Sequence, residues 1–161
     1  MTQNQYWKEL YQLRVHTTFI ELKLEQAEKR ERIIKIFLAV TSSSCIGAWA
    51  IWNELSWVWA AIIALSQVLG AISQYLPYKG RVKAYSSLVN ELEELMIRAE
   101  FRWHDIASGK LTESEINKSR FNIRAMKSKL LKKYIQTTIS ADDKLHCKAE
   151  KQAQLYLSEF Y

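Results

Sequence analysis

The sequence predicts an all-α protein: a two-helix transmembrane hairpin that continues into long cytoplasmic helices, followed by two C-terminal cytoplasmic helices. Three observations support this fold class. The 161 residues include only four glycines and one proline, too little turn chemistry for a β-rich protein. Two long stretches in the middle of the chain carry no charged side chain. Apolar stripes at helical spacing run into and out of these stretches. The length suits one domain, so we expect a single membrane domain over residues 1–161.

The charge-free stretches are residues 36–53 and 55–78. At about 1.5 Å per residue, the first is just long enough to cross a hydrocarbon core of about 30 Å, and the second crosses it with some tilt. A backbone in hydrocarbon must satisfy its own hydrogen bonds, so both should be helices, and their short connection makes them antiparallel neighbours. A soluble bundle with two buried central helices is the alternative, because residues 41–44 lower the hydropathy of the first stretch.

The flanks of the hairpin predict its orientation. Cations precede the first stretch and follow the second, at Lys29, Arg30, Arg32, Lys35, Lys79, Arg81 and Lys83. The connection carries Glu54 and no cation. Positively charged flanks stay in the cytoplasm, so we expect a multi-pass protein of the inner membrane with both termini cytoplasmic. The first 32 residues are too charged for a cleavable signal, so the first span is expected to act as an uncleaved anchor.

The soluble parts are predicted to be residues 1–35, 79–108 and a basic helical segment, 112–161. The stripe before the hairpin is Tyr6, Leu10, Leu13, Thr17, Ile20, Leu24 and Ala27, and the one after it is Val82, Tyr85, Val89, Leu92, Met96, Ala99, Trp103 and Ile106. Whether the stripes pair within one chain or between chains stays open. Pro77 is expected to kink the second helix where it leaves the bilayer.

Helix-end signals divide the C-terminal part. Gly109 is expected to cap one helix, and Thr112 with Glu115 forms a capping-box pattern for the next, at residues 113–137. That helix places Ile116, Ile123, Met126, Leu130 and Tyr134 on one stripe. Asp142 and Asp143 indicate the start of a last helix, which ends near Phe160.

The helix at 113–137 is strongly basic. Seven of the chain's 23 lysines and arginines lie on it without an intervening carboxylate: Lys118, Arg120, Arg124, Lys127, Lys129, Lys132 and Lys133. This basic face is typical of a surface that binds anionic lipid, RNA, a nucleotide or an acidic protein. The alternative is a solvated face paired with carboxylates of the preceding helix, Glu91, Glu93, Glu94 and Glu100.

The hairpin carries small and polar residues on one side of each stretch. The candidate pore or oligomer face is Thr41, Ser44, Ala48, Gln67, Gly70 and Gln74. A buried amide such as Gln67 needs a partner in lipid, and small residues let helices approach closely. Both helix packing in a homo-oligomer and a pore lined by polar groups satisfy this pattern.

Signals for catalysis are weak. Arg98 and His104 match the loose R-x(4–6)-H spacing of HEPN ribonucleases, in which an Arg and a His position a phosphodiester for attack by a 2′-hydroxyl. Chance alone produces such a match easily, and a histidine near a helix end also favours the helix dipole. The sequence contains no phosphate-binding glycine loop and no Cys/His metal set, so we expect no cofactor, no metal and no enzyme activity.

The layout resembles the SLATT-type two-transmembrane effector proteins of bacterial antiphage systems, including cyclic-nucleotide, retron and CRISPR-associated loci. The resemblance rests on the hairpin and its basic flanks, Lys29 to Lys35 and Lys79 to Lys83. It implies an oligomeric effector that forms a pore or perturbs the membrane when a cytoplasmic protein, nucleotide or RNA triggers it. The alternative is a membrane-tethered interaction module whose basic helix docks a partner, nucleic acid or anionic lipid.

Overall fold

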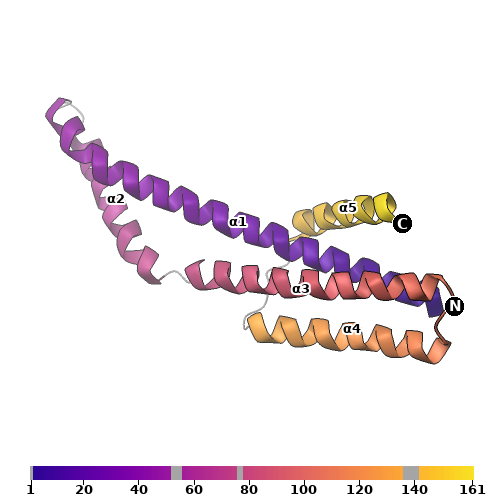
Figure 1. Cartoon of the computed structure of the whole chain (residues 1–161). Helices are drawn as coiled ribbons and strands as arrows, with labels where there is room; N and C mark the ends of the chain where they lie inside the picture. The colour runs from indigo at the N-terminus through magenta and orange to yellow at the C-terminus, as the bar shows by residue number, and fades with distance from the viewer. Residues whose placement is uncertain (1, 52–55, 76–77, 136–141) are drawn as a thin grey trace. The chain divides into compact units, whose positions relative to one another are not determined.

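The chain is all-helical in the computed structural model, which describes residues 2–51, 56–75, 78–135 and 142–161 (Figure 1). The helices are α1 (Thr2–Ile51), α2 (Ser56–Tyr75), α3 (Tyr78–Ala107), α4 (Glu113–Tyr134) and α5 (Asp143–Phe160). The predicted all-α class is therefore confirmed. The chain divides into two compact units, unit 1 (Met1–Glu25 and Lys83–Tyr161) and unit 2 (Gln26–Val82).

The N-terminal segment and the first charge-free stretch belong to one helix. α1 runs unbroken for 50 residues, which confirms the predicted continuity. The second stretch ends at a boundary, because α2 stops at Tyr75 and α3 starts at Tyr78. Pro77, where the sequence predicts a kink, lies outside the described residues.

Local capping chemistry separates α3 from α4. Gly109 adopts a positive φ of 69°, and the Lys110 amide donates to the Asp105 carbonyl oxygen at 3.1 Å. The Thr112 hydroxyl then accepts from the Glu115 amide, while the Glu115 carboxylate accepts from the Thr112 amide at 2.8 Å. The predicted glycine cap and capping box are both confirmed.

α4 ends earlier than the sequence predicts. Its last residue is Tyr134 rather than Thr137, and Ile135 has an extended backbone with φ −110° and ψ 95°. The chain around this point is rich in β-branched residues, which lose rotamer freedom in a helix and weaken its last turn. The side chain of Asp142 caps the next helix by accepting from the Leu145 amide at 3.1 Å, so the predicted start of α5 is confirmed.

The apolar stripes of α1 and α3 form the core of unit 1. Buried members include Tyr6, Leu10, Leu13 and Ile20 from α1, and Leu92, Met96, Ala99 and Ile106 from α3. The Tyr6 phenol donates to the Ala99 carbonyl oxygen at 3.0 Å, which joins the two helices inside the core. The stripes therefore pair within one chain, and this answers the question that the sequence left open.

α5 packs on α1 through small residues that the sequence analysis did not single out. Ala149 and Ala153 are completely buried and lie in a second cluster with Val15 and Leu22 of α1. Alanines four residues apart share one helix face and let the backbones of two helices approach. The salt bridge between Lys23 and Asp142, at 3.5 Å, holds the N-terminal end of α5 to α1.

α4 contributes a narrower apolar face than predicted. Ile116 and Ile123 are buried, as expected from the stripe, but Met126 is 38% exposed. Three residues advance about 300° around a helix, so Met126 lies about 60° from Ile123. This rotation takes Met126 out of the core and places it in the wall of the groove described below.

A buried ion pair also attaches α4 to α1. Glu9 is only 3% exposed, and its Oε2 lies 2.5 Å from Arg124 Nε. Lys127 Nζ lies 4.0 Å from the other carboxylate oxygen. A carboxylate taken out of water is tolerated where cations and hydrogen bonds replace its hydration. The contact therefore fixes which face of α4 lies against α1.

Replacing Arg124 tests this ion pair. Arg124→Gln leaves the Glu9 carboxylate buried without its closest cation, so we expect the free energy of unfolding to fall by about 2–3 kcal/mol. The matched control is Lys129→Gln on the exposed face of α4, which should change it by less than about 0.5 kcal/mol. Chemical denaturation of the detergent-solubilised chain, followed by circular dichroism, measures both. Equal effects of the two substitutions would contradict the structural role of the pair.

Eight large apolar side chains of unit 2 are exposed among the described residues. They are Ile33, Ile36, Val40, Trp57, Ile63, Leu65, Val68 and Ile72, whereas every buried side chain in the described part of the chain belongs to unit 1. Over the described residues, no helix has both the length and the apolar character needed to cross a bilayer. The transmembrane assignment of residues 36–53 and 55–78 therefore stays a prediction.

Candidate functional site

The seven cations of α4 fall into a paired group and an unpaired group. Lys133 binds Glu91 of α3 at 2.8 Å, Arg120 donates to the amide oxygen of Gln5, and Arg124 and Lys127 contact Glu9. Lys118, Lys129 and Lys132 are exposed and form no ion pair within the described ranges. The basic face is thus partly used to hold the bundle together, and only these three cations have no internal partner.

The carboxylates that hold α4 differ from most of those expected. Among the candidates on α3, Glu91 pairs with α4. Glu94 instead pairs with Arg98 along its own helix, and Glu100 accepts from the Tyr156 phenol of α5. The Lys133 ammonium and then the Tyr134 phenol hydrogen-bond to Glu91 and lower the pKa of its carboxyl group. Glu9, the carboxylate that binds two α4 cations, comes from α1.

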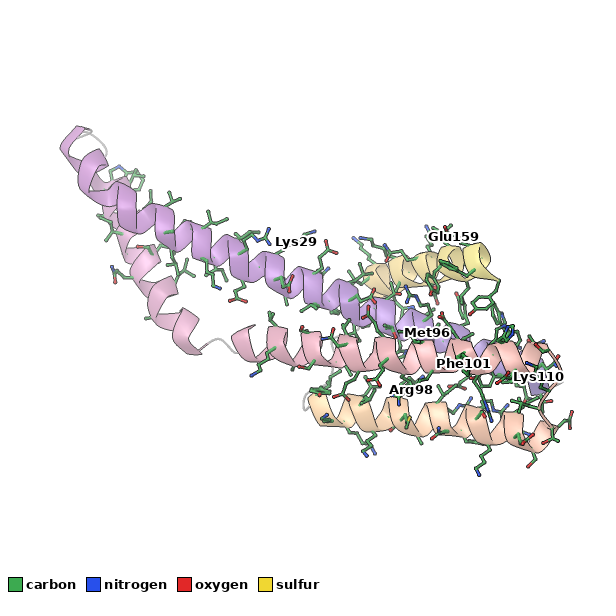
Figure 2. All side chains as sticks on the ribbon, in the orientation of Figure 1. Lys29, Met96, Arg98, Phe101, Lys110 and Glu159 are labelled. Carbon is green, nitrogen blue, oxygen red and sulfur yellow. The ribbon has the colours of Figure 1, made fainter. Side chains whose placement is uncertain are left out.

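A groove lies between α3 and α4, with a volume of about 860 Å³. Three cations line it: Arg98 and Arg102 from α3, and Lys118 from α4. Figure 2 shows Arg98 between the two helices. The remaining wall combines Phe121, Met126 and smaller apolar residues with the polar side chains of Ser119 and Asn122. We call this the α3–α4 groove.

The charges in this groove are largely available to a ligand. Arg102 Nε donates to the neutral Ser119 Oγ at 3.3 Å, and the positive charge of Arg102 contributes to lowering the pKa of Glu115. Arg98 lies 3.5 Å from Glu94, but both side chains are more than half exposed, so water screens the pair. The only acidic side chain in the wall, Glu115, already accepts from the Thr112 amide and hydroxyl, which lower its pKa.

Tyr6 of α1 also lines the groove. It is fully buried, with its phenol bonded to the Ala99 carbonyl oxygen. Burial raises the pKa of Tyr6 to about 12, although the nearby Arg102 guanidinium acts in the opposite direction. Tyr6 also stacks on Trp103, with ring centroids 6.1 Å apart. The phenol therefore serves as a neutral structural group rather than as an acid or base near pH 7.

The two residues of the ribonuclease-like spacing lie on different sides of α3. Six residues advance about 600°, so Arg98 and His104 are about 120° apart around the helix axis and about 9 Å apart along it. Arg98 lines the groove and His104 does not. This geometry gives no shared site for a phosphodiester, because both groups must reach the same phosphate.

The candidate pore or oligomer face is only partly described. Thr41, Ser44, Ala48 and Gln74 lie in helical backbone, and their side chains are outside the described structure. Gln67 is exposed in unit 2. A Cβ added at Gly70 would meet no described atom within 4 Å.

Metal ligation finds no support in the described part of the chain. No group of three or more His, Cys, Asp or Glu side chains converges there. Cys147 is a free, exposed thiol, while the Cys45 side chain is not described. Among the described residues the α3–α4 groove is a candidate site, and spacing alone did not reveal it because its residues come from three helices.

Comparison with known proteins identifies no relative. No family model, curated protein or solved structure matches this chain.

His16 provides a titratable group inside unit 1. It lies half-buried on α1, and burial, then the positive charge of Lys127, then His146 lower its pKa below 6.5. The unfolded chain therefore takes up a proton on this imidazole at a higher pH than the folded chain does. The stability contributed by neutral His16 is complete above about pH 6.5 and is lost as the pH falls below it.

The pH dependence of unfolding tests this assignment. We expect the melting temperature of the wild-type protein to fall more steeply between about pH 7 and pH 5 than that of His16→Gln, which has no proton to bind. His104→Gln, at an exposed position on α3, is the control and should keep the wild-type slope. Parallel curves for the wild type and His16→Gln would show that His16 does not couple protonation to unfolding.

Proposed function

We propose that this protein is a membrane effector, in which the hairpin of unit 2 enters the cytoplasmic membrane and unit 1 receives a cytoplasmic trigger. The observation that carries the proposal is the contrast between the two units. Unit 1 buries its apolar stripes in a core, whereas no described residue of unit 2 is buried, and Trp57, Leu65 and Val68 are 72%, 56% and 54% exposed. Exposed apolar side chains on a helix without charged residues are covered by lipid or by another protein.

The charge pattern favours lipid as the cover. No Asp, Glu, Lys or Arg occurs between Leu55 and Tyr78, so α2 carries no charged side chain whose desolvation would oppose insertion. Lys79, Arg81 and Lys83 follow at once, as expected for a cytoplasmic flank that meets anionic headgroups. Both soluble ends then lie in the cytoplasm, and the protein is a multi-pass protein of the inner membrane.

The polar residues of α2 favour an assembly of several copies. Gln67 exposes its amide, which in hydrocarbon would need a hydrogen-bonding partner from another copy or from pore water. A homo-oligomer with Gln67 at its seam supplies a partner for this amide, and the same seam becomes a permeation path when the helices separate.

The biological setting follows from resemblance. The hairpin, its short connection and its basic flanks resemble the SLATT-type effectors of bacterial antiphage systems. On this basis we assign the protein to antiviral defence, where opening of the membrane assembly would depolarise an infected cell. A cytoplasmic protein, nucleotide or RNA would supply the trigger.

A membrane-tethered interaction module is the second candidate. The exposed, unpaired Lys118, Lys129 and Lys132 of α4 favour it, because they offer charge to a partner without disturbing the bundle. The two functions differ in what the hairpin must do. Replacing unit 2 by an unrelated hairpin of equal length preserves the activity of a tethered module and abolishes that of an effector.

Membrane insertion is tested by placing a charge on the exposed face of α2. Leu65→Arg should move the protein from the membrane pellet to the alkaline-carbonate extract, because a cation near the bilayer centre costs about 3 kcal/mol. Leu155→Arg is the matched control, since Leu155 is similarly exposed but lies on α5 of unit 1. Release of the wild-type protein by carbonate would contradict insertion.

Permeation is tested in vesicles. Vesicles that contain the wild-type protein, either with its trigger or at a high protein-to-lipid ratio, should release a small encapsulated dye. Gln67→Leu should change the release rate by about tenfold while insertion stays intact, because it replaces the amide on the proposed path with an apolar side chain. Ser128→Leu on the exposed side of α4 should have no effect. A wild-type rate equal to that of empty vesicles under all conditions would remove the effector proposal.

A further inference from the structure

We propose that the α3–α4 groove binds a nucleoside polyphosphate, with its phosphates on Arg98, Arg102 and Lys118 and its base against Phe121 and Met126. The site lies entirely in unit 1. In the proposed effector, this ligand would be the trigger. Only its role as a trigger rests on the proposed function. The groove binds the ligand whether or not the hairpin enters a bilayer.

The cations are arranged to hold phosphate. Arg98 and Arg102 are four residues apart on α3, so their side chains share one helix face, and Lys118 faces them from α4. A guanidinium offers a planar pair of donors that matches two phosphate oxygens, and the ammonium adds a compact charge. Three cations stand against the single carboxylate among the lining residues, Glu115, so the charged side chains of the wall are positive in sum. A polyphosphate supplies the negative charge that this imbalance lacks.

The apolar half of the groove distinguishes a nucleotide from a simple anion. Phe121 is 57% exposed and Met126 is 38% exposed, although both line the same groove as the cations. The Arg120 guanidinium lies 5.1 Å from the centre of the Phe121 ring and adds positive charge beside it. A nucleobase has an apolar face that stacks on such a ring, whereas inorganic phosphate leaves it in water.

The size of the groove agrees with this ligand. Its volume of about 860 Å³ lies within the range of about 300–1,000 Å³ typical of small-molecule sites. Because the walls come from α3 and α4, an occupant would bridge the two helices. A ligand that binds the folded chain and not the unfolded chain should raise the melting temperature of the protein by mass action.

A titration on the full chain in detergent tests the proposal. The probe is the N-methylanthraniloyl derivative of ATP, followed by fluorescence anisotropy. We expect saturable binding below about 1 mM, and about tenfold weaker binding for both Arg98→Gln and Lys118→Gln, each of which removes one phosphate contact. Lys129→Gln and Lys132→Gln are matched controls on the same helix, outside the groove, and should change the Kd by less than about twofold.

Competition identifies the ligand class. Unlabelled ATP should displace the probe at about tenfold lower concentration than pyrophosphate, because only ATP carries a base. Pyrophosphate that competes as well as ATP would overturn the nucleotide assignment, as would a short oligouridylate that competes better than ATP. Equal weakening in the groove and control variants would show diffuse electrostatic binding, and absence of saturable binding would remove the site. Thermal unfolding without the probe verifies that Arg98→Gln and Lys118→Gln remain folded. If Lys118→Gln is unfolded, the binding result for Arg98→Gln decides the test.

This titration separates the two proposals. It is made in detergent, so a protein that fails to insert into vesicles still gives the expected binding curve. A protein that inserts and leaks dye but shows no saturable binding retains the effector proposal and loses the nucleotide.

Discussion

The burial of one carboxylate constrains the arrangement of unit 1. Glu9 is 3% exposed inside a helical core, and it needs the cations of α4 to replace the water it has lost. Apolar contacts alone are not directional and would let α4 rotate on α1. The pairing of Arg124 and Lys127 with Glu9 selects one rotation of α4 about its own axis. In this rotation Lys118 and Phe121 line the groove beside α3. The candidate site thus depends on a contact that is not part of it.

The basic face of α4 has two separate uses. Arg124, Lys127 and Lys133 are engaged by carboxylates, so their charge is balanced inside the bundle. Lys118 lies in a groove with two arginines and one carboxylate, Glu115, so cations outnumber anions among the groove's lining residues. The net charge of +6 is therefore a poor guide to binding, since its distribution between internal pairs and the groove matters more than its size.

Local signals predicted the ends of the helices well, because caps depend on a few neighbouring residues. Gly109, the Thr112–Glu115 box and Asp142 all act as expected. The stripe of α1 also enters the core as predicted. The predicted end of α4 at Thr137 was wrong, because α4 ends at Tyr134 and Ile135 is extended. The groove was missed because its walls come from three helices.

The sequence by itself determined the helical class, the helix boundaries set by caps, and the separation of charged ends from a charge-free middle. These properties follow from residue type and spacing, and they depend only on residues that are close together in the sequence. Only the tertiary structure decided that the stripes pair within one chain and which cations are used internally. Arg124 and Glu9 are 115 residues apart in the chain, and no local pattern relates them. Electrostatic interaction depends on the distance between charges, and the packing of the helices sets that distance. The same packing places Arg98, Arg102 and Lys118 around one groove.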